Sequence, residues 1–233
     1  DHVHGDGPFT ASASARLKQM TGAAHALLTT SGTHALEMAV RLVGVRPGDE
    51  VILPSFTFSS GATAIVAAGA TPVFVDMDPA TGNIAADQIE AAITDRTRAI
   101  EVMHYGGVPV DMATVLSLAE AHGLRVIEDN AHGLGVTTPG GVLGTMGDVG
   151  IQSFHDTKNV HCGEGGAVLF GSDDLTEPAE VMREKGTNRS RFLRGQVDKY
   201  TWVDWGSSYL PSELNAAVLD AQLASFDTIQ SAR

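Results

Sequence analysis

Lys158 lies in a segment whose residue types could carry out chemistry on a carbonyl compound. The segment Ser153–Asn159 (Ser-Phe-His-Asp-Thr-Lys-Asn) leaves a predicted strand and leads into the glycine-rich stretch Gly163–Gly166. A lysine in a confined, partly desolvated loop can lose its proton near neutral pH and act as a Schiff-base amine or as a base. Most lysines are solvated surface groups, so Lys158 alone does not decide between the two interpretations.

The segment Ser31–His34 (Ser-Gly-Thr-His) follows a predicted strand and opens a predicted helix. Free backbone N–H groups and the positive end of the helix dipole make such a place an anion site, and glycine lets a phosphate approach closely. The competing interpretation is that Ser31 is an ordinary helix N-cap. Taken alone, the segment favours the cap.

Two further candidate groups come at the ends of predicted strands. The strand Arg125–Asp129 ends in two acids, and adjacent strand residues face opposite sides, so one of the acids can point into a given site. Asp129 could pair with a protonated ring nitrogen, a metal or a helix end, or it could cap the next turn in solvent. The aromatic rings of Pro54–Phe58 could belong to the core or stack on a planar cofactor.

Taken together, these separate groups fit one cofactor. An anion site at a helix start, an acid at a strand end, an amine on a loop and a nearby aromatic ring are what pyridoxal phosphate requires. In open parallel sheets, ligands bind beyond the carboxyl ends of the strands, which is where these groups stand. The sequence therefore predicts a pyridoxal-phosphate site around Lys158.

Short apolar runs alternate with helical patterns along most of the chain. Strands are predicted at Ala26–Thr30, Glu50–Leu53, Pro72–Val75, Ala99–His104, Arg125–Asp129, Val149–Phe154 and Ala167–Phe170. Helices are predicted at Thr33–Val43, Ser59–Ala68, Asp87–Ile93, Asp111–His122 and Ser212–Arg233. Such alternation implies right-handed crossovers. We therefore expect one α/β domain whose mainly parallel sheet is sandwiched by helices.

Composition excludes several classes of protein. The net charge of −13 argues against a nucleic-acid partner, and no apolar run is long enough to span a membrane. A single cysteine, Cys162, fits a reducing cytoplasm, and no basic neighbour marks it as a nucleophile. His2, His4 and Asp6 could bind a metal, but we interpret them as a solvated terminus and expect no metal site.

The ends of the sequence suggest a piece of a longer protein. The chain begins at Asp1 without an initiator methionine, and the predicted helix Ser212–Arg233 reaches the last residue without a stop signal. We therefore expect a fragment trimmed at both ends.

The motifs resemble those of the DegT/DnrJ/EryC1/StrS family of sugar aminotransferases. The resemblance runs from Gly5–Thr10 to the final helix and thus covers nearly the whole chain. Arg183–Arg189, Arg194–Trp202 and Gly206–Leu210 look like signatures of one subgroup, the dTDP-4-amino-4,6-dideoxygalactose transaminases of polysaccharide antigen synthesis. The family has the large domain of the fold-type I pyridoxal-phosphate transferases, so the resemblance implies that residues 1–233 form this domain without its smaller C-terminal companion.

The resemblance also implies roles for individual residues. Lys158 would hold the cofactor as a Schiff base and move the catalytic proton, and His155 would support it. Asp129 would pair with the ring nitrogen, and His132 would lie near the ring oxygen. Phe58 would stack on the ring.

The phosphate of the cofactor would have its own set of contacts. The resemblance assigns it the backbone N–H groups of Thr33 and His34 and the hydroxyl of Ser153. Ser208 stands where many members have an asparagine that reaches the phosphate in a neighbouring subunit. The resemblance assigns this contact to Ser208, although serine is shorter than asparagine. The family pattern implies a homodimer.

The implied reaction moves the amino group of glutamate to a 4-keto-6-deoxy nucleotide sugar, with dTDP-4-dehydro-6-deoxy-D-glucose as the expected substrate. The alternatives are a different 4-keto or 3-keto nucleotide sugar and a non-catalytic cofactor-binding domain. Relatives that dehydrate sugars carry a histidine at the position of Lys158, which argues against that chemistry. A nicotinamide enzyme is disfavoured because no Gly-x-Gly-x-x-Gly joins the first strand to its helix.

Overall fold

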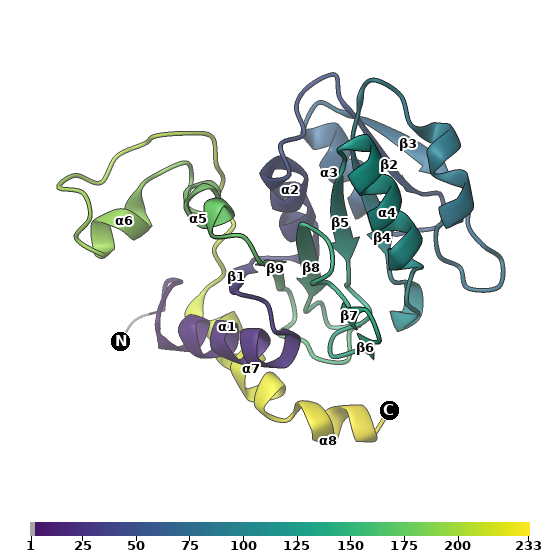
Figure 1. The fold of residues 1–233 in the computed structure, drawn as a ribbon. Helices are drawn as coiled ribbons and strands as arrows, with labels where there is room; N and C mark the ends of the chain where they lie inside the picture. The colour runs from purple at the N-terminus through teal and green to yellow at the C-terminus, as the bar shows by residue number, and fades with distance from the viewer. Residues whose placement is uncertain (1–2) are drawn as a thin grey trace.

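The computed structural model describes residues 3–233 and contains a seven-stranded sheet in the order β1-β9-β8-β5-β4-β2-β3 (Figure 1). The strands are β1 His25–Thr29, β2 Glu50–Pro54, β3 Thr71–Val75, β4 Thr97–Met103, β5 Arg125–Asp129, β8 Val149–Ser153 and β9 Gly166–Phe170. The short strands β6 Thr137–Thr138 and β7 Gly141–Val142 form a separate antiparallel pair. His2, one of the residues considered for a metal, lies outside the described residues.

Strand direction sets where a ligand can bind. Strands β3, β2, β4, β5 and β8 are mutually parallel, whereas β9 runs antiparallel to both β8 and β1. The carboxyl ends of all the parallel strands therefore meet at one edge, and β1 ends there as well. The prediction of a mainly parallel sheet is confirmed.

Helices cover both faces of the sheet (Figure 1). They are α1 Pro8–Thr21, α2 Gly32–Leu42, α3 Ser60–Ala67, α4 Met112–His122, α5 Thr176–Arg183, α6 Arg189–Leu193, α7 Glu213–Ala224 and α8 Phe226–Ser231. Helices α2, α3 and α5 bury their apolar side chains against one face. Helices α1, α7 and α4 pack against the other face. The predicted sandwich is confirmed, and among residues 3–233 no helix is both long and apolar enough to cross a membrane.

Two predicted helices are wrong in detail. Asp87–Ile93 forms two single 3₁₀ turns, Ala86–Gln88 and Glu90–Ala92, because the segment is too short to propagate an α-helix and its N–H groups bond three residues back. The helix expected over Ser212–Arg233 is divided at Ser225 into α7 and α8. The sequence interpretation also missed α1, α5 and α6.

The division at Ser225 has a packing cause. Ser225 leaves the helical backbone region at φ −106° and ψ 15°. The following residue, Phe226, is partly buried against the cluster that joins α1 and α7 to the sheet. A Cβ atom at Gly135 would lie 2.6 Å from Cζ of Phe226, so the ring fills the space beside a glycine backbone. The helix therefore turns at Ser225 to place this ring.

Glu213 joins the two ends of the chain. Helix α1 has Gly7 at its N-cap, which offers no side chain to its free N–H groups. The Glu213 carboxylate replaces the missing cap: it accepts from the N–H of Gly7 at 3.0 Å, of Phe9 at 2.8 Å and of Thr10 at 3.0 Å, and from the Thr10 hydroxyl. Burial alone would raise the pKa of Glu213, but these hydrogen bonds outweigh it and hold the pKa below its usual value.

We predict that Glu213→Gln destabilises the protein at neutral pH by about 2–4 kcal/mol, because one acceptor oxygen becomes an N–H₂ group facing other donors. A carboxyl whose pKa is lowered by folding stabilises above its unfolded pKa and loses this effect as pH falls through the folded pKa. The difference from wild type in urea unfolding should therefore shrink toward acid pH. The exposed Glu120 on α4 supplies the control, Glu120→Gln, and equal effects of both variants would contradict the prediction.

Candidate active site

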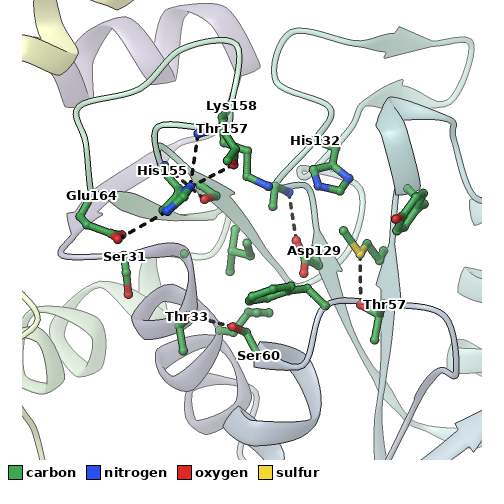
Figure 2. A pocket seen from close by; sticks show the side chains of 18 of the residues that line it. Ser31, Thr33, Thr57, Ser60, Asp129, His132, His155, Thr157, Lys158 and Glu164 are labelled. Atoms are coloured by element: carbon green, nitrogen blue, oxygen red, sulfur yellow. Dashed lines mark hydrogen bonds and ion pairs between the residues drawn. The ribbon is translucent and has the colours of Figure 1, made fainter.

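A cavity of about 400 Å³ lies beyond the carboxyl ends of β1, β4, β5 and β8 (Figure 2). This pocket is large enough for a small cofactor. Seven of the residues proposed from the sequence line it together: Thr33, Phe58, Asp129, His132, Ser153, His155 and Lys158. Segments far apart in the sequence thus meet at the predicted edge of the sheet.

The N-terminus of α2 forms one end of the pocket. Ser31, Gly32 and Thr33 line it, and the first turn of the helix has N–H groups without intrahelical partners. A Cβ atom at Gly32 would lie 2.9 Å from Cβ of Ser153, so glycine allows the helix start to approach the end of β8. The Thr33 hydroxyl lies 2.7 Å from the hydroxyl of Ser60, which ties α2 to α3. Backbone N–H groups and hydroxyls at a helix start suit an anion such as phosphate.

His34 and Ser208 do not line this pocket. The N–H of His34 donates to the Ser31 hydroxyl at 3.0 Å, which confirms Ser31 as the N-cap, and the His34 ring packs on Tyr209. Ser208 is exposed, forms an isolated antiparallel β-bridge with Glu184, and lines a separate surface groove. Roles for His34 and Ser208 toward a phosphate therefore stay predictions.

Asp129 ends β5 at the pocket and is only 3% exposed. Its Oδ1 accepts from the N–H of Ala131 at 3.0 Å. Burial raises the pKa of Asp129, and this outweighs the hydrogen bond from Ala131 and the positive charges of Lys158 and His104, which lower it. A buried carboxylate that faces a cavity is best satisfied by a cationic partner, and the protonated nitrogen of a heterocycle would be one.

The second acid of β5 faces the other side of the sheet, as strand alternation predicts. Glu128 is fully buried and accepts from His104 Nε2 at 2.9 Å. It also accepts from the N–H groups of Gly144 at 2.9 Å and of Met146 and Gly147 at 2.6 Å. Glu128 therefore holds the loop after β7, and Asp129 is the acid available to the site.

Lys158 stands opposite Asp129, on the loop between β8 and β9 (Figure 2). Its N–H donates to the carbonyl of His155 at 2.9 Å, which closes a turn and directs the side chain into the pocket. Burial lowers the pKa of Lys158, and the charge of Asp129 opposes this shift without reversing it. The amine therefore becomes neutral, and hence nucleophilic, at lower pH than a surface lysine would.

His132 presents a defined face to the pocket. Its Nδ1 accepts from the N–H of Gly106 at 3.1 Å, so a neutral ring carries its proton on Nε2. Burial, and then the nearby charge of Lys158, lower the pKa of His132 and favour this neutral form. The ring also packs edge-on against Tyr105, with centroids 5.4 Å apart. His132 can therefore donate a hydrogen bond without carrying a charge.

The remaining predicted residues lie near the mouth of the pocket. Phe58 is 68% exposed, which leaves the ring free to cover a planar ligand. The His155 ring contacts Thr157 at 3.0 Å and Glu164 at 3.6 Å (Figure 2). It also contacts Asp156 at 2.9 Å, so it belongs to the rim.

Sequence interpretation missed several lining residues, among them Tyr105, Ser60 and Met103, whereas Phe56 belongs to the segment Pro54–Phe58 that it considered. Phe56 and Tyr105 form an aromatic pair with centroids 4.6 Å apart, and Tyr105 directly follows β4 and His104. Its place after a strand end was a usable signal. Ser60 and Met103 carried none, because their position depends on how α3 and β4 pack. Cys162 is buried, and burial followed by the charge of Glu164 raises the pKa of its thiol to about 11, which agrees with its interpretation as an ordinary cysteine.

The arrangement fits a phosphorylated pyridine aldehyde. An anion cup at the start of α2, a buried acid, a lysine amine of lowered pKa and an exposed aromatic ring surround one cavity on an α/β sheet, which is the set of groups that pyridoxal phosphate requires. The chain belongs to the DegT/DnrJ/EryC1/StrS aminotransferase family, whose sequence profile matches residues 2–233. Pyridoxal phosphate is the cofactor of this family. The fold, the family and the cofactor predicted from the sequence are confirmed.

Similar proteins agree with this assignment. The chain is 39% identical to GDP-perosamine synthase of Caulobacter vibrioides over 91% of this chain and 55% of that protein. It is 43% identical to UDP-N-acetyl-3-dehydro-alpha-D-glucosamine 3-aminotransferase of Acidithiobacillus ferrooxidans, over 74% of this chain and 47% of that protein. The crystal structure of 3-amino-5-hydroxybenzoic acid synthase superposes with a TM-score of 0.89 at 36% identity, covering 95% of this chain and 57% of that one. The chain thus spans about half the length of these relatives.

We predict that pyridoxal phosphate bound to this protein can be fixed by borohydride to Lys158 alone. The lowered pKa of Lys158 should let the attachment form at a pH where an ordinary lysine is still protonated. Mass spectrometry of the reduced protein should locate the label on Lys158, and Lys158→Ala should carry none. Lys199→Ala, at an exposed position, is the control. A label that survives in Lys158→Ala would contradict the assignment.

We also predict that Gly32→Ala weakens pyridoxal-phosphate binding about tenfold to a hundredfold, because its new methyl group would push α2 away from Ser153. Gly171→Ala is a matched control, since no atom lies within 4 Å of a Cβ atom there. Absorbance titration with the cofactor measures the affinity, and urea unfolding of both variants separates binding from stability. Equal cofactor affinity of Gly32→Ala and wild type would count against phosphate binding at the start of α2.

Proposed function

We propose that this protein transfers the amino group of glutamate to a 4-keto-6-deoxy nucleotide sugar, with dTDP-4-dehydro-6-deoxy-D-glucose as the favoured acceptor. The single observation that carries the proposal is the pairing of the Lys158 amine with the buried Asp129 across one pocket. Membership of the aminotransferase family supports amino transfer. The motifs Arg183–Arg189, Arg194–Trp202 and Gly206–Leu210 support the subgroup.

We assign each polar residue of the pocket a role according to its charge. When bound, pyridoxal phosphate supplies an electron sink for the carbon that exchanges its proton. Lys158 Nζ is the group that takes and returns this proton, because its pKa is lowered by burial and its side chain enters the pocket. Asp129 holds a proton on the ring nitrogen. His132, neutral with its proton on Nε2, donates toward the ring oxygen.

The rest of the pocket binds and orients. The helix start at Gly32 and Thr33, together with the Ser153 hydroxyl, holds the phosphate. Phe58 covers one face of the ring, and His155 supports Lys158 from the rim. The assignments of Thr33, Ser153, Phe58 and His155 follow the family pattern, and Gly32 is added because it lines the pocket beside Ser153.

We further propose that residues 1–233 form the cofactor-binding large domain and that a second subunit completes the site. Ser208 is exposed and lies outside the pocket of its own chain, as expected for a residue that serves a partner. The segment before it carries large exposed apolar side chains, which suit an interface: Phe192, Leu193, Tyr200, Trp202, Val203 and Trp205. A homodimer would bury them.

A second candidate function concerns the acceptor. One relative is named for a 3-dehydro sugar nucleotide and another for GDP-perosamine, so amination of a different keto sugar is the alternative. The similarity to 3-amino-5-hydroxybenzoic acid synthase shows that this fold is not confined to proteins named for sugars. A non-catalytic cofactor-binding domain would keep the pocket but not turn over.

The deciding experiment is an assay of the protein at its full natural length with glutamate and a panel of 4-keto and 3-keto nucleotide sugars. We expect amination of the 4-keto-6-deoxy substrate, detected as 2-oxoglutarate and as the amino sugar by mass spectrometry, and no turnover by Lys158→Ala. Amination of 3-keto sugars alone would reject the proposed acceptor. Cofactor absorbance that glutamate does not change would reject amino transfer itself.

A further inference from the structure

Glu101 is a buried carboxyl group that no interaction described above uses. It lies in the middle of β4, its side chain is fully buried, and within residues 3–233 neither of its carboxyl oxygens has a hydrogen-bond partner. Gly61 of α3 packs directly against it, since a Cβ atom there would overlap Oε1 of Glu101. A polar group left without partners in the core calls for a physical reason.

Glu101 projects from the same face of the sheet as Asp129. The parallel register aligns Glu101 with Ile127 and Met103 with Asp129. Paired residues of neighbouring strands point to the same side, and residues two apart along a strand share a face. Met103 and Asp129 both line the pocket, so Glu101 lies one step beneath the pocket floor, under α3.

The elements around Glu101 bring few charges to it. Helix α3 has no titratable residue, and Glu50 of β2 is engaged with Arg96 and Thr94 at the far end of its strand. Glu128 and His104 bond each other on the opposite face of the sheet. On α2, the three titratable side chains bond elsewhere, to Thr30, Tyr209 and the carbonyl of Ala67: His34, Glu37 and Arg41. What remains is Asp129, with Lys158 beyond it across the pocket.

One proton has to be assigned between the two buried acids. Two carboxyl groups in one dry region do not both ionise readily, and the better-stabilised one takes the charge. Asp129 has an N–H donor from Ala131 and the positive charge of Lys158, whereas Glu101 has neither. The proton therefore belongs on Glu101. Burial, and then the charge of Asp129, raise the pKa of Glu101 to about 8.

We propose that Glu101 is a positioning residue that acts through Asp129. While Glu101 is a neutral acid, Asp129 is the only negative charge at the pocket floor among residues 3–233, and the ionisation of Glu101 adds a second one. The added charge would strengthen the hold of Asp129 and Lys158 on their protons. Proton release from Lys158 would then become harder, so Glu101 sets an alkaline limit for the site. This consequence rests on the proposed roles of Lys158 and Asp129, but the buried proton itself does not.

The first test is an infrared pH titration of the cofactor-free protein. We expect a protonated side-chain carboxyl band at pH 7 that disappears with a midpoint near pH 8 in wild type. The band should be absent from Glu101→Gln and present in the exposed control Glu120→Gln. Absence of the band in wild type, or its persistence in Glu101→Gln, would overturn the proposal. The wild-type measurement needs no variant to fold.

Stability gives an independent check with a defined sign. An acid whose pKa rises from 4.5 to about 8 on folding keeps its proton where the unfolded chain has lost it, so its contribution to stability falls between these pH values. Glu101→Gln removes this dependence. Relative to wild type, its folding equilibrium constant should increase by at least about tenfold from pH 5 to pH 8. A constant ratio across this range would contradict a buried proton on Glu101.

The positioning role needs a readout at Lys158. The pH dependence of acylation of Lys158, followed by mass spectrometry in the cofactor-free protein, reports when the amine loses its proton. We expect Glu101→Gln to react at lower pH than wild type, because no second negative charge develops. Glu101→Met, of similar volume, should behave alike. Unchanged Lys158 profiles would overturn the positioning role. Because these tests use no cofactor or substrate, they remain decisive if amino transfer fails.

Discussion

The structure depends on the different surroundings of the two adjacent acids at the end of β5, Glu128 and Asp129. A β-strand points neighbouring side chains to opposite faces, so Glu128 and Asp129 cannot share an environment. Glu128 receives three backbone N–H groups and a histidine, which together stabilise its position and order the loop that contains Gly144. Asp129 receives one N–H group and faces a cavity. The unequal distribution of donors makes one acid structural and leaves the other available for chemistry.

Close backbone packing brings the anion site to this acid. Gly32 lets α2 approach the end of β8, and Gly166 lies so near the carbonyl of Ser31 that a Cβ atom there would overlap it. Both glycines stand where β1, β8 and β9 are adjacent in the sheet. The proposed phosphate site therefore depends on tight strand packing as much as on the helix dipole. A flexible surface loop could not hold N–H groups and hydroxyls at such fixed positions.

Much of this arrangement was predictable because parallel strands leave a strong pattern. β5 was predicted at Arg125–Asp129 with its observed bounds, and Asp129 and Lys158, which both line the cavity, were proposed from their places at or after strand ends. What local sequence could not provide was packing across space. The two 3₁₀ turns near Ile89 formed where a helix was expected, and Ser60 and Met103 joined the pocket through tertiary contacts. The unpaired, buried carboxyl of Glu101 could likewise not be predicted from the sequence, because its neighbours in the strand form an ordinary apolar run.

The reversed direction of β9 has a mechanical consequence for the lysine. A crossover connection would leave β8 at the pocket edge and re-enter the sheet from the opposite edge, whereas this loop returns directly, with Ser153 paired to Gly166. Both ends of the loop are thus clamped by one ladder of hydrogen bonds, and Phe154 and Cys162 bond across its base. The ammonium group can therefore travel only as far as its own four-carbon chain rotates. The amine therefore explores few positions, all of them beside the cavities that Lys158 lines.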